Sequence, residues 1–152
     1  LNILDLERNS ISTIPWKSLL DMTHLEILKL DSNMIRSLDI GALKYDENIQ
    51  YNERIHIKVL NLTNNKIDSV DPNVFLIFNP KRLEEIDLRF NFIKHLSESI
   101  GKHIIEKNFL NNFNKFHLQD NELVCDCNLV WLKNVLNRMK YYNSTECHMN
   151  LD

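Results

Sequence analysis

The stretch Leu60-Asn61-Leu62-Thr63-Asn64-Asn65-Lys66-Ile67 decides the fold, because its pattern L-x-L-x-x-N-x-I returns throughout the chain. Five copies occur, and leucine, isoleucine or phenylalanine fills the leucine positions. A further apolar residue stands three positions before the first of these in every copy. With that residue included, the copies span 1–11, 25–35, 57–67, 83–93 and 113–123. Apolar residues at every slot of five copies indicate a structural repeat.

The spacing of the leucines predicts how one copy folds. The L-x-L core has period two, so it forms a short strand whose leucines face one side and whose intervening residues face the other. One copy cannot bury its leucines alone, but stacked strands, about 4.8 Å apart, merge their apolar sides into one core. The pattern is identified as the leucine-rich repeat, which implies an α/β solenoid of horseshoe shape with a parallel sheet on its concave side.

An asparagine follows each strand, where the chain must turn sharply. The turn leaves backbone groups inside the coil without partners in the sheet. A buried asparagine amide can satisfy them, because it both donates and accepts hydrogen bonds. We therefore expect five asparagines to form a structural ladder without any catalytic role: Asn9, Asn33, Asn65, Asn91 and Asn121.

Length and composition restrict the possible partners. The 152 residues suit one domain, and the hydrophobic content of 43% suits a solenoid core. The net charge of -3 argues against binding nucleic acid or an anionic membrane through bulk charge. We expect no cofactor and no nucleic acid. Leu1 already occupies the first slot of a repeat, so we expect a part of a longer protein, with any membrane attachment through segments outside this chain.

The segments between the repeats are unequal, since successive ladder asparagines lie 24, 32, 26 and 30 residues apart. The longest interval carries a polar insertion over about 44–54, which we expect to form a loop or short helix outside the core. The last interval has Ile100, Ile104 and Ile105 at helical spacing. This predicts a short amphipathic helix over 98–108 on the convex side.

The repeat pattern ends after the fifth copy, and a segment with two cysteines and a tryptophan follows. It reads Cys125-Asp126-Cys127-Asn128-Leu129-Val130-Trp131-Leu132. Asp126 or Asn128 could cap a helix that runs to about Tyr141. Trp131 or Leu132 could then cover the exposed end of the core. The apolar face of this helix would consist of Leu129, Leu132, Val135, Leu136 and Met139.

The stretch C-D-C-x-L-x-W-L resembles the cysteine-rich C-terminal cap of extracellular leucine-rich repeat proteins such as Toll-like receptors, Slit proteins and the Nogo receptor. The resemblance implies five repeats over 1–122 and a truncated, helical, disulfide-bonded cap over 123–152. It also implies an extracellular protein-binding module of a secreted or cell-surface receptor or adhesion protein, without catalysis. The alternative is the C-terminal ectodomain part of a Toll-like innate-immune receptor.

Caps of this family pair their first cysteine with their third, so the resemblance implies a disulfide between Cys125 and Cys147. Cys127 would lack its partner, and it could compete for Cys147 because it lies two residues from Cys125. A zinc site built from the three cysteines and His148 is the alternative. Its C-x-C spacing is tighter than that of structural zinc sites, so we expect no metal.

Two glycosylation sequons, at Asn61 and Asn143, fit a secreted chain. Asn61 is an intervening residue of L-x-L, so its side chain should point to solvent. A glycan there would occupy the middle of the concave face. Binding would then shift to an edge, the cap or the convex side.

The intervening residues of the strands form rows across the concave face, and these rows hold the candidate binding residues. Arg89 and Phe90 are of types enriched at interface hot spots. The partner would be a protein ligand or co-receptor. Because exposed strand positions do not support the core, replacing Lys29 or Arg89 should change the stability by less than roughly 0.5 kcal/mol. The candidates are Lys29, Asp87, Arg89, Phe90 and His117.

Overall fold

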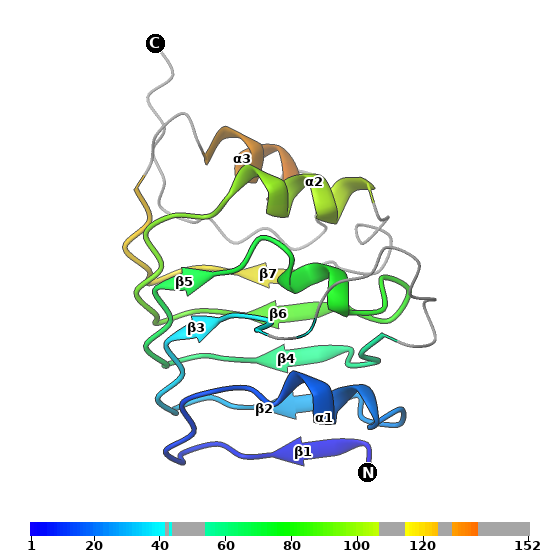
Figure 1. Cartoon of the computed structure of the whole chain (residues 1–152). Coiled ribbons are helices and arrows are strands. Elements are labelled where there is room, and N and C mark those ends of the chain that lie inside the picture. Colours follow the sequence, from blue (N-terminus) through cyan, green and yellow to red (C-terminus); the bar gives the residue numbers. More distant parts are fainter. Residues whose placement is uncertain (42, 44–53, 107–114, 125–128, 137–152) are drawn as a thin grey trace.

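The L-x-L stretches form the strands of one parallel sheet (Figure 1). The computed structural model describes residues 1–41, 43, 54–106, 115–124 and 129–136. Register pairs equivalent repeat positions, so that Leu28 lies between Leu4 and Leu60. The predicted five-stranded parallel sheet of a solenoid is thereby confirmed. In spatial order the strands are β1 (Ile3–Asp5), β2 (Ile27–Lys29), β4 (Val59–Asn61), β6 (Glu85–Asp87) and β7 (Lys115–His117).

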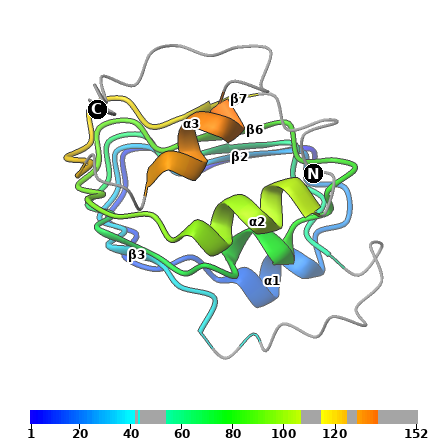
Figure 2. The ribbon, with the colours of Figure 1, turned by 90° about the horizontal axis from the view of Figure 1, so that it is seen from above.

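The chain turns after each strand and returns along a second side of the coil, seen from above in Figure 2. Two short strands, β3 (Ser37–Leu38) and β5 (Ser69–Val70), pair in parallel just after their turns. Helices then complete the coils on the side away from the large sheet (Figure 2). They are α1 (Trp16–Leu20), a 3-10 helix (Val74–Ile77) and α2 (Glu98–Glu106).

The inward-facing side chains of the two sides form one apolar core. Leu28 and Leu60 are each 1% exposed, as their place as the first leucine of L-x-L predicts. Phe75, from the 3-10 helix, meets Phe116 of β7 edge to face, with ring centroids 5.8 Å apart. Ile100 and Ile104 of α2 are fully buried, which confirms the predicted amphipathic helix as far as Glu106.

The asparagines after the strands link consecutive turns. Asn65 Nδ2 donates to the carbonyls of Leu30 (2.9 Å) and Leu62 (3.1 Å), and its Oδ1 accepts from the Ile35 N–H at 3.1 Å. Each of these asparagines thus bonds to its own turn and to the preceding one. The same three contacts recur, shifted by one repeat each time, at Asn33, Asn91 and Asn121.

Asn9 differs from the other ladder asparagines. Its side chain is exposed and donates to the Leu6 and Glu7 carbonyls of its own turn, each at 3.0 Å. Within the described residues, the Asn9 amide reaches no turn other than its own. The expectation of a buried ladder residue is therefore wrong for Asn9.

Helix α3 (Val130–Leu136) lies over the end of the core beyond β7 (Figures 1 and 2). Trp131 packs against α2 so closely that a Cβ atom at Gly101 would collide with its ring. Leu129, just before α3, and Leu132, within it, are both buried. The predicted extension to Tyr141, the helix cap at Asp126 or Asn128, and Cys125, Cys127 and Cys147 lie outside the described residues.

The polar insertion falls largely outside the described residues, which resume at Arg54. Arg54 is 5% exposed, so the prediction that the insertion stays outside the core through this residue is wrong. The reason is its place beside Ile55, whose N–H donates to the Ile77 carbonyl at 2.8 Å. Among the helices in the described ranges, none combines the length and apolar character needed to span a membrane.

Candidate functional site

The candidate residues lie on the side of the large sheet that faces away from the core, here called the sheet face. Lys29, Asp87 and His117 occupy the same row on β2, β6 and β7. Asp87 and His117 are register partners on adjoining strands, whereas β4 separates them from Lys29. Arg89 and Phe90 follow β6 at the turn. The structure therefore gathers four of the five candidates at one end of the sheet face.

Lys29 is engaged in an exposed ion pair. Its Nζ lies 2.9 Å from Asp5 Oδ2, across the β1–β2 pair. This hydrogen bond raises the pKa of Lys29 and lowers the pKa of Asp5. Both side chains are more than 40% exposed, so the pair adds little to stability, and Lys29 stays accessible to a partner.

Asp87 corrects the prediction of a solvent-facing residue, because it is 6% exposed. Arg89 covers it: the guanidinium Nη2 lies 2.6 Å from Asp87 Oδ2, and Nε lies 3.0 Å from both carboxylate oxygens. Burial alone would raise the pKa of Asp87. The hydrogen bonds from the Arg89 side chain and backbone N–H outweigh burial, and they hold this pKa below its usual value. Asp87 therefore positions Arg89 rather than meeting a partner itself.

His117 is part of a second charged group, together with Glu85 and Lys115. Its Nε2 lies 3.1 Å from Glu85 Oε1, and Lys115 Nζ lies 3.1 Å from Glu85 Oε2. The His117 side chain is 17% exposed, so little of it can touch a partner. Sequence reasoning missed Glu85 and Lys115, although opposite charges at equivalent positions of neighbouring repeats are the signal for such a pair.

Phe90 stands where every repeat adopts a left-handed backbone. The φ angles at this position lie between 54° and 57°, with Phe90 at 55°. Its side chain is 53% exposed. Phe92, two residues on and 49% exposed, was missed by sequence reasoning, although it too fills a slot that polar residues occupy in three other repeats. The other left-handed residues at the Phe90 position are Arg8, Ser32, Asn64 and Asp120.

Asn61 lies near the centre of the sheet face and is half-buried rather than fully exposed. Its Nδ2 donates to Asp31 Oδ1 at 3.2 Å, and its Oδ1 accepts from the Thr63 N–H at 3.0 Å. The amide that a glycan would modify therefore already has a neighbour on β2's turn. The second sequon asparagine, Asn143, lies outside the described residues.

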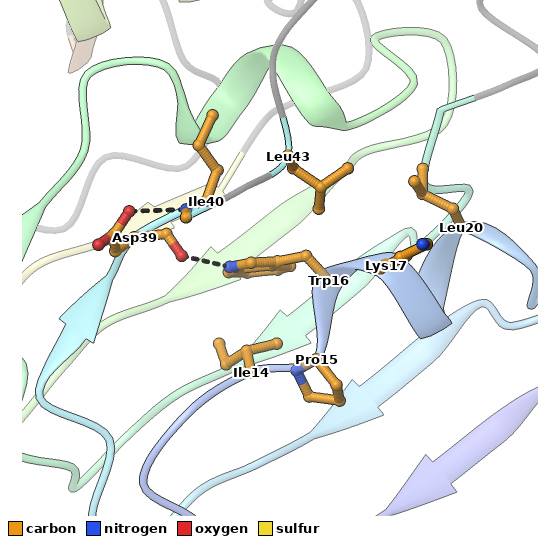
Figure 3. A pocket seen from close by; sticks show the side chains of 9 residues that line it. Ile14, Pro15, Trp16, Lys17, Leu20, Asp39, Ile40 and Leu43 are labelled. Atoms are coloured by element: carbon orange, nitrogen blue, oxygen red, sulfur yellow. Dashed lines mark hydrogen bonds between the residues drawn. The ribbon is translucent and has the colours of Figure 1, made fainter.

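A pocket of about 520 Å³ opens on the helical side, between α1 and the segment after β3 (Figure 3). The Trp16 indole crosses its floor and donates from Nε1 to the Asp39 carbonyl at 2.9 Å. Apolar side chains form most of the wall: Ile14, Pro15, Leu20, Ile40 and Leu43. The described residues contain no group of three or more His, Cys, Asp or Glu placed to hold a metal ion. The sheet face, with its charged and aromatic residues, is therefore the better candidate site.

Comparisons with known proteins agree with this architecture. The family described as Leucine rich repeat matches residues 1–51, and the description Leucine Rich Repeat also matches residues 56–76. Over 130 residues the chain is 25% identical to leucine-rich repeat and fibronectin type III domain-containing protein 1 of Danio rerio, covering 86% of this chain and 17% of that protein. Over 127 residues it is 28% identical to Toll-like receptor 9 of Mus musculus, covering 84% and 11%.

Proposed function

Because this chain is a leucine-rich repeat protein, we propose that it is an extracellular protein-binding module of a secreted or cell-surface receptor or adhesion protein. It would act through surface complementarity, without catalysis or a cofactor. Its matched relatives are far longer, since the chain spans 17% and 11% of their lengths. The activity of the whole protein is thus part of this proposal.

One observation carries the proposal: the register places equivalent side chains side by side on five adjoining strands. At about 4.8 Å per strand, this makes a continuous surface roughly 20 Å across. That extent suits a folded protein partner better than a small molecule, which binds in an enclosed cavity. The charges on this surface are of both signs and largely paired with each other, which disfavours a polyanion.

Within this surface, Lys29, Arg89 and Phe90 would contact the partner, whereas His117 is too buried to add much contact. Arg89 is 44% exposed and held rigid by Asp87, so little side-chain entropy is lost when it binds. Phe90 adds an exposed aromatic side chain. These are the features of interface hot spots.

A binding assay with secreted and cell-surface ectodomains, using the chain as a multivalent probe, tests this proposal. Lys29→Glu should weaken binding of a recovered partner about tenfold, because it reverses an accessible charge on this surface. Lys17→Glu, an exposed change on α1, is the matched control and should have no effect. Binding that depends on Lys17 and not on the sheet face would contradict the proposal.

The extracellular location rests on the cap resemblance and on the sequons at Asn61 and Asn143. In this proposal Cys125 pairs with Cys147 and leaves Cys127 free. Peptide mapping of non-reduced protein secreted from cells should show the Cys125–Cys147 linkage. A dominant Cys127–Cys147 peptide would refute the pairing, and three free thiols would refute the extracellular location.

The second candidate function is that of a Toll-like innate-immune receptor, with this chain as the C-terminal part of its ectodomain. The 28% identity to mouse Toll-like receptor 9 over 127 residues favours it. Sequencing the full-length transcript distinguishes the two candidates. A transmembrane helix followed by a cytoplasmic signalling domain supports the receptor, and fibronectin-type domains would count against it.

A further inference from the structure

The turn after β7 carries an exposed carboxylate, Asp120, whose side chain has no ion pair or hydrogen bond within the described residues. Residues 83–94 and 115–124 contain five carboxylates but only three lysine or arginine side chains. Each of these three is paired: Arg89 with Asp87, Lys94 with Glu122, and Lys115 with Glu85. Of the two carboxylates that remain, Glu84 lies at the other end of β6, roughly 20 Å along the strand from the turn. Asp120 is therefore the carboxylate left over at the turns.

Asp120 stands opposite Phe90 on the adjoining turn, where the chain leaves β6 and β7 (left in Figure 1). The register pairs Asp87 with His117, and three residues further on it places Phe90 opposite Asp120. The backbone keeps this alignment past the strands, because the Phe90 N–H donates to the Gln119 carbonyl at 3.2 Å. Both residues are left-handed, with φ angles of 55° and 57°. Their side chains therefore leave the two turns in the same direction, from backbones about 4.8 Å apart.

The Phe90 ring is open to solvent beside this carboxylate. It is 53% exposed, and it makes no aromatic contact within the described ranges. Its neighbour on the other side, Asn64, is uncharged, and the amide of that side chain donates to Ser32 Oγ at 3.2 Å. The electron-rich face of a phenyl ring attracts cations, and a carboxylate next to the ring adds to this attraction. Phe90 and Asp120 together thus favour a positively charged group.

Arg89 does not neutralise Asp120, although the two side chains lie close enough to interact. Three hydrogen bonds, from Nε and Nη2, hold the Arg89 guanidinium on the Asp87 carboxylate. This contact is the main cause that raises the pKa of Arg89, and the charge of Asp120 adds a smaller part. On the preceding turn, Lys66 and Asp68 carry opposite charges, so they leave the balance unchanged. A negative charge therefore remains beside the Phe90 ring.

We propose that Phe90 and Asp120 form a subsite of the sheet face that receives a lysine or arginine side chain of the partner protein. The cation packs over the phenyl ring and pairs with the Asp120 carboxylate. This inference rests on the proposed protein-binding function, and it names the chemistry that the partner presents at this end of the face. Asp120 thereby selects the partner by charge, whereas Lys29, beyond β4, lies outside the subsite.

A phage-displayed library of random peptides, panned against the chain, tests this assignment. Recovered peptides should share a lysine or arginine. A synthetic peptide of the recovered sequence, titrated by fluorescence anisotropy, should bind Asp120→Asn about fivefold and Phe90→Asn about tenfold more weakly than the unaltered chain. Asparagine tolerates the left-handed backbone, so both variants should fold. A peptide with methionine in place of its basic residue should bind Asp120→Asn and the unaltered chain equally.

Two controls separate this subsite from the rest of the molecule. Glu84→Gln removes the same charge from the other end of β6, and Lys29→Glu changes the far part of the sheet face, so both should leave the peptide affinity unchanged. Binding that is lost in Lys29→Glu but kept in Asp120→Asn overturns this inference and leaves the proposed function standing. Equal losses in Glu84→Gln and Asp120→Asn, recovered peptides without a basic residue, or the recovery of no peptide also overturn it.

Discussion

At the scale of single residues, the Asn65 side chain supplies hydrogen bonds to backbone groups that lose their sheet partners at a sharp turn. Its amide reaches three backbone groups on two turns, and the residue is 4% exposed. Asn65→Leu removes these three hydrogen bonds and leaves the buried Ile35 N–H without its partner, so we expect the free energy of unfolding to fall by about 2 kcal/mol or more. Urea unfolding measures this loss.

Asn9→Leu is the matched control for this prediction, because Asn9 holds the same position but is exposed and bonds only within its own turn. Its loss should be well under half as large, since water can replace the amide. Equal losses at the two positions would mean that contacts between turns contribute nothing.

The contact between Arg89 and Asp87 changes the expectation drawn from the sequence, in which replacing Arg89 alters stability by less than roughly 0.5 kcal/mol. Arg89→Ala would leave a carboxylate that is 6% exposed without its guanidinium partner. We now expect a loss of about 1–3 kcal/mol in unfolding free energy at neutral pH. Lys29→Glu should still change stability by less than roughly 0.5 kcal/mol, because Lys29 is exposed. An Arg89→Ala variant as stable as the parent would contradict the buried pair.

The same pair makes stability depend on pH. The folded-state pKa of Asp87 lies below its ordinary value of 3.8. Its contribution is therefore complete above the unfolded-state pKa and is lost as the pH falls through the folded-state pKa. Urea midpoints measured from pH 6 down to pH 2 should fall less steeply in Asp87→Asn than in the parent. Asp5→Asn, at an exposed pair, is the control and should hardly alter the slope.

Phe90 is predicted to work against stability. Replacing it by asparagine, which tolerates a left-handed backbone, should raise the unfolding free energy by about 0.5–1 kcal/mol. Phe92→Asn removes a similarly exposed ring, but its φ is not left-handed, so no gain is expected there. A destabilised Phe90→Asn variant would show that the ring packs favourably, which would weaken the argument for its role in binding.

At the scale of elements, α2 and α3 meet through a glycine and a tryptophan. Gly101→Ala would usually favour a helix by up to about 1 kcal/mol. Here the added methyl group collides with the Trp131 ring, so we expect a net loss of about 1–3 kcal/mol and a changed tryptophan fluorescence spectrum. Lys102→Ala, at the next and exposed position, should cost only a few tenths of a kcal/mol. A stabilised Gly101→Ala variant would refute the close packing.

The sequence predicts the strands and helices that a regular spacing of apolar residues defines. It does not predict the burial of polar residues that depends on contacts between segments far apart in the chain. The strands follow from alternation, and α2 follows from Ile100 and Ile104. The burial of Asp87 does not follow, because the L-x-L pattern directs this side chain away from the core. It is covered only because the Arg89 side chain bends back over it. Arg54 is buried because of Ile55, which pairs with a segment more than twenty residues away. Phe92 could have been found by comparing equivalent slots.

At the scale of the whole molecule, each repeat contacts only its neighbours, so coupling between mutations should follow their order in the stack. Asn65 and Asn91 both donate to the Leu62 carbonyl, at 3.1 and 3.0 Å. Asn33 and Asn91 share no such group. Replacing one of two donors leaves the carbonyl a partner, and replacing both leaves it none.

Double-mutant cycles with serine therefore should give different results for neighbouring and distant repeats. The loss in Asn65→Ser/Asn91→Ser should exceed the sum of the single losses by about 0.5 kcal/mol or more. The losses in Asn33→Ser/Asn91→Ser should add within about 0.5 kcal/mol, since these residues lie two repeats apart. Urea unfolding of the six proteins required, the parent included, measures both cycles. Strong coupling between Asn33 and Asn91 would mean that the repeats act as one undivided core rather than as a stack joined by contacts between neighbours.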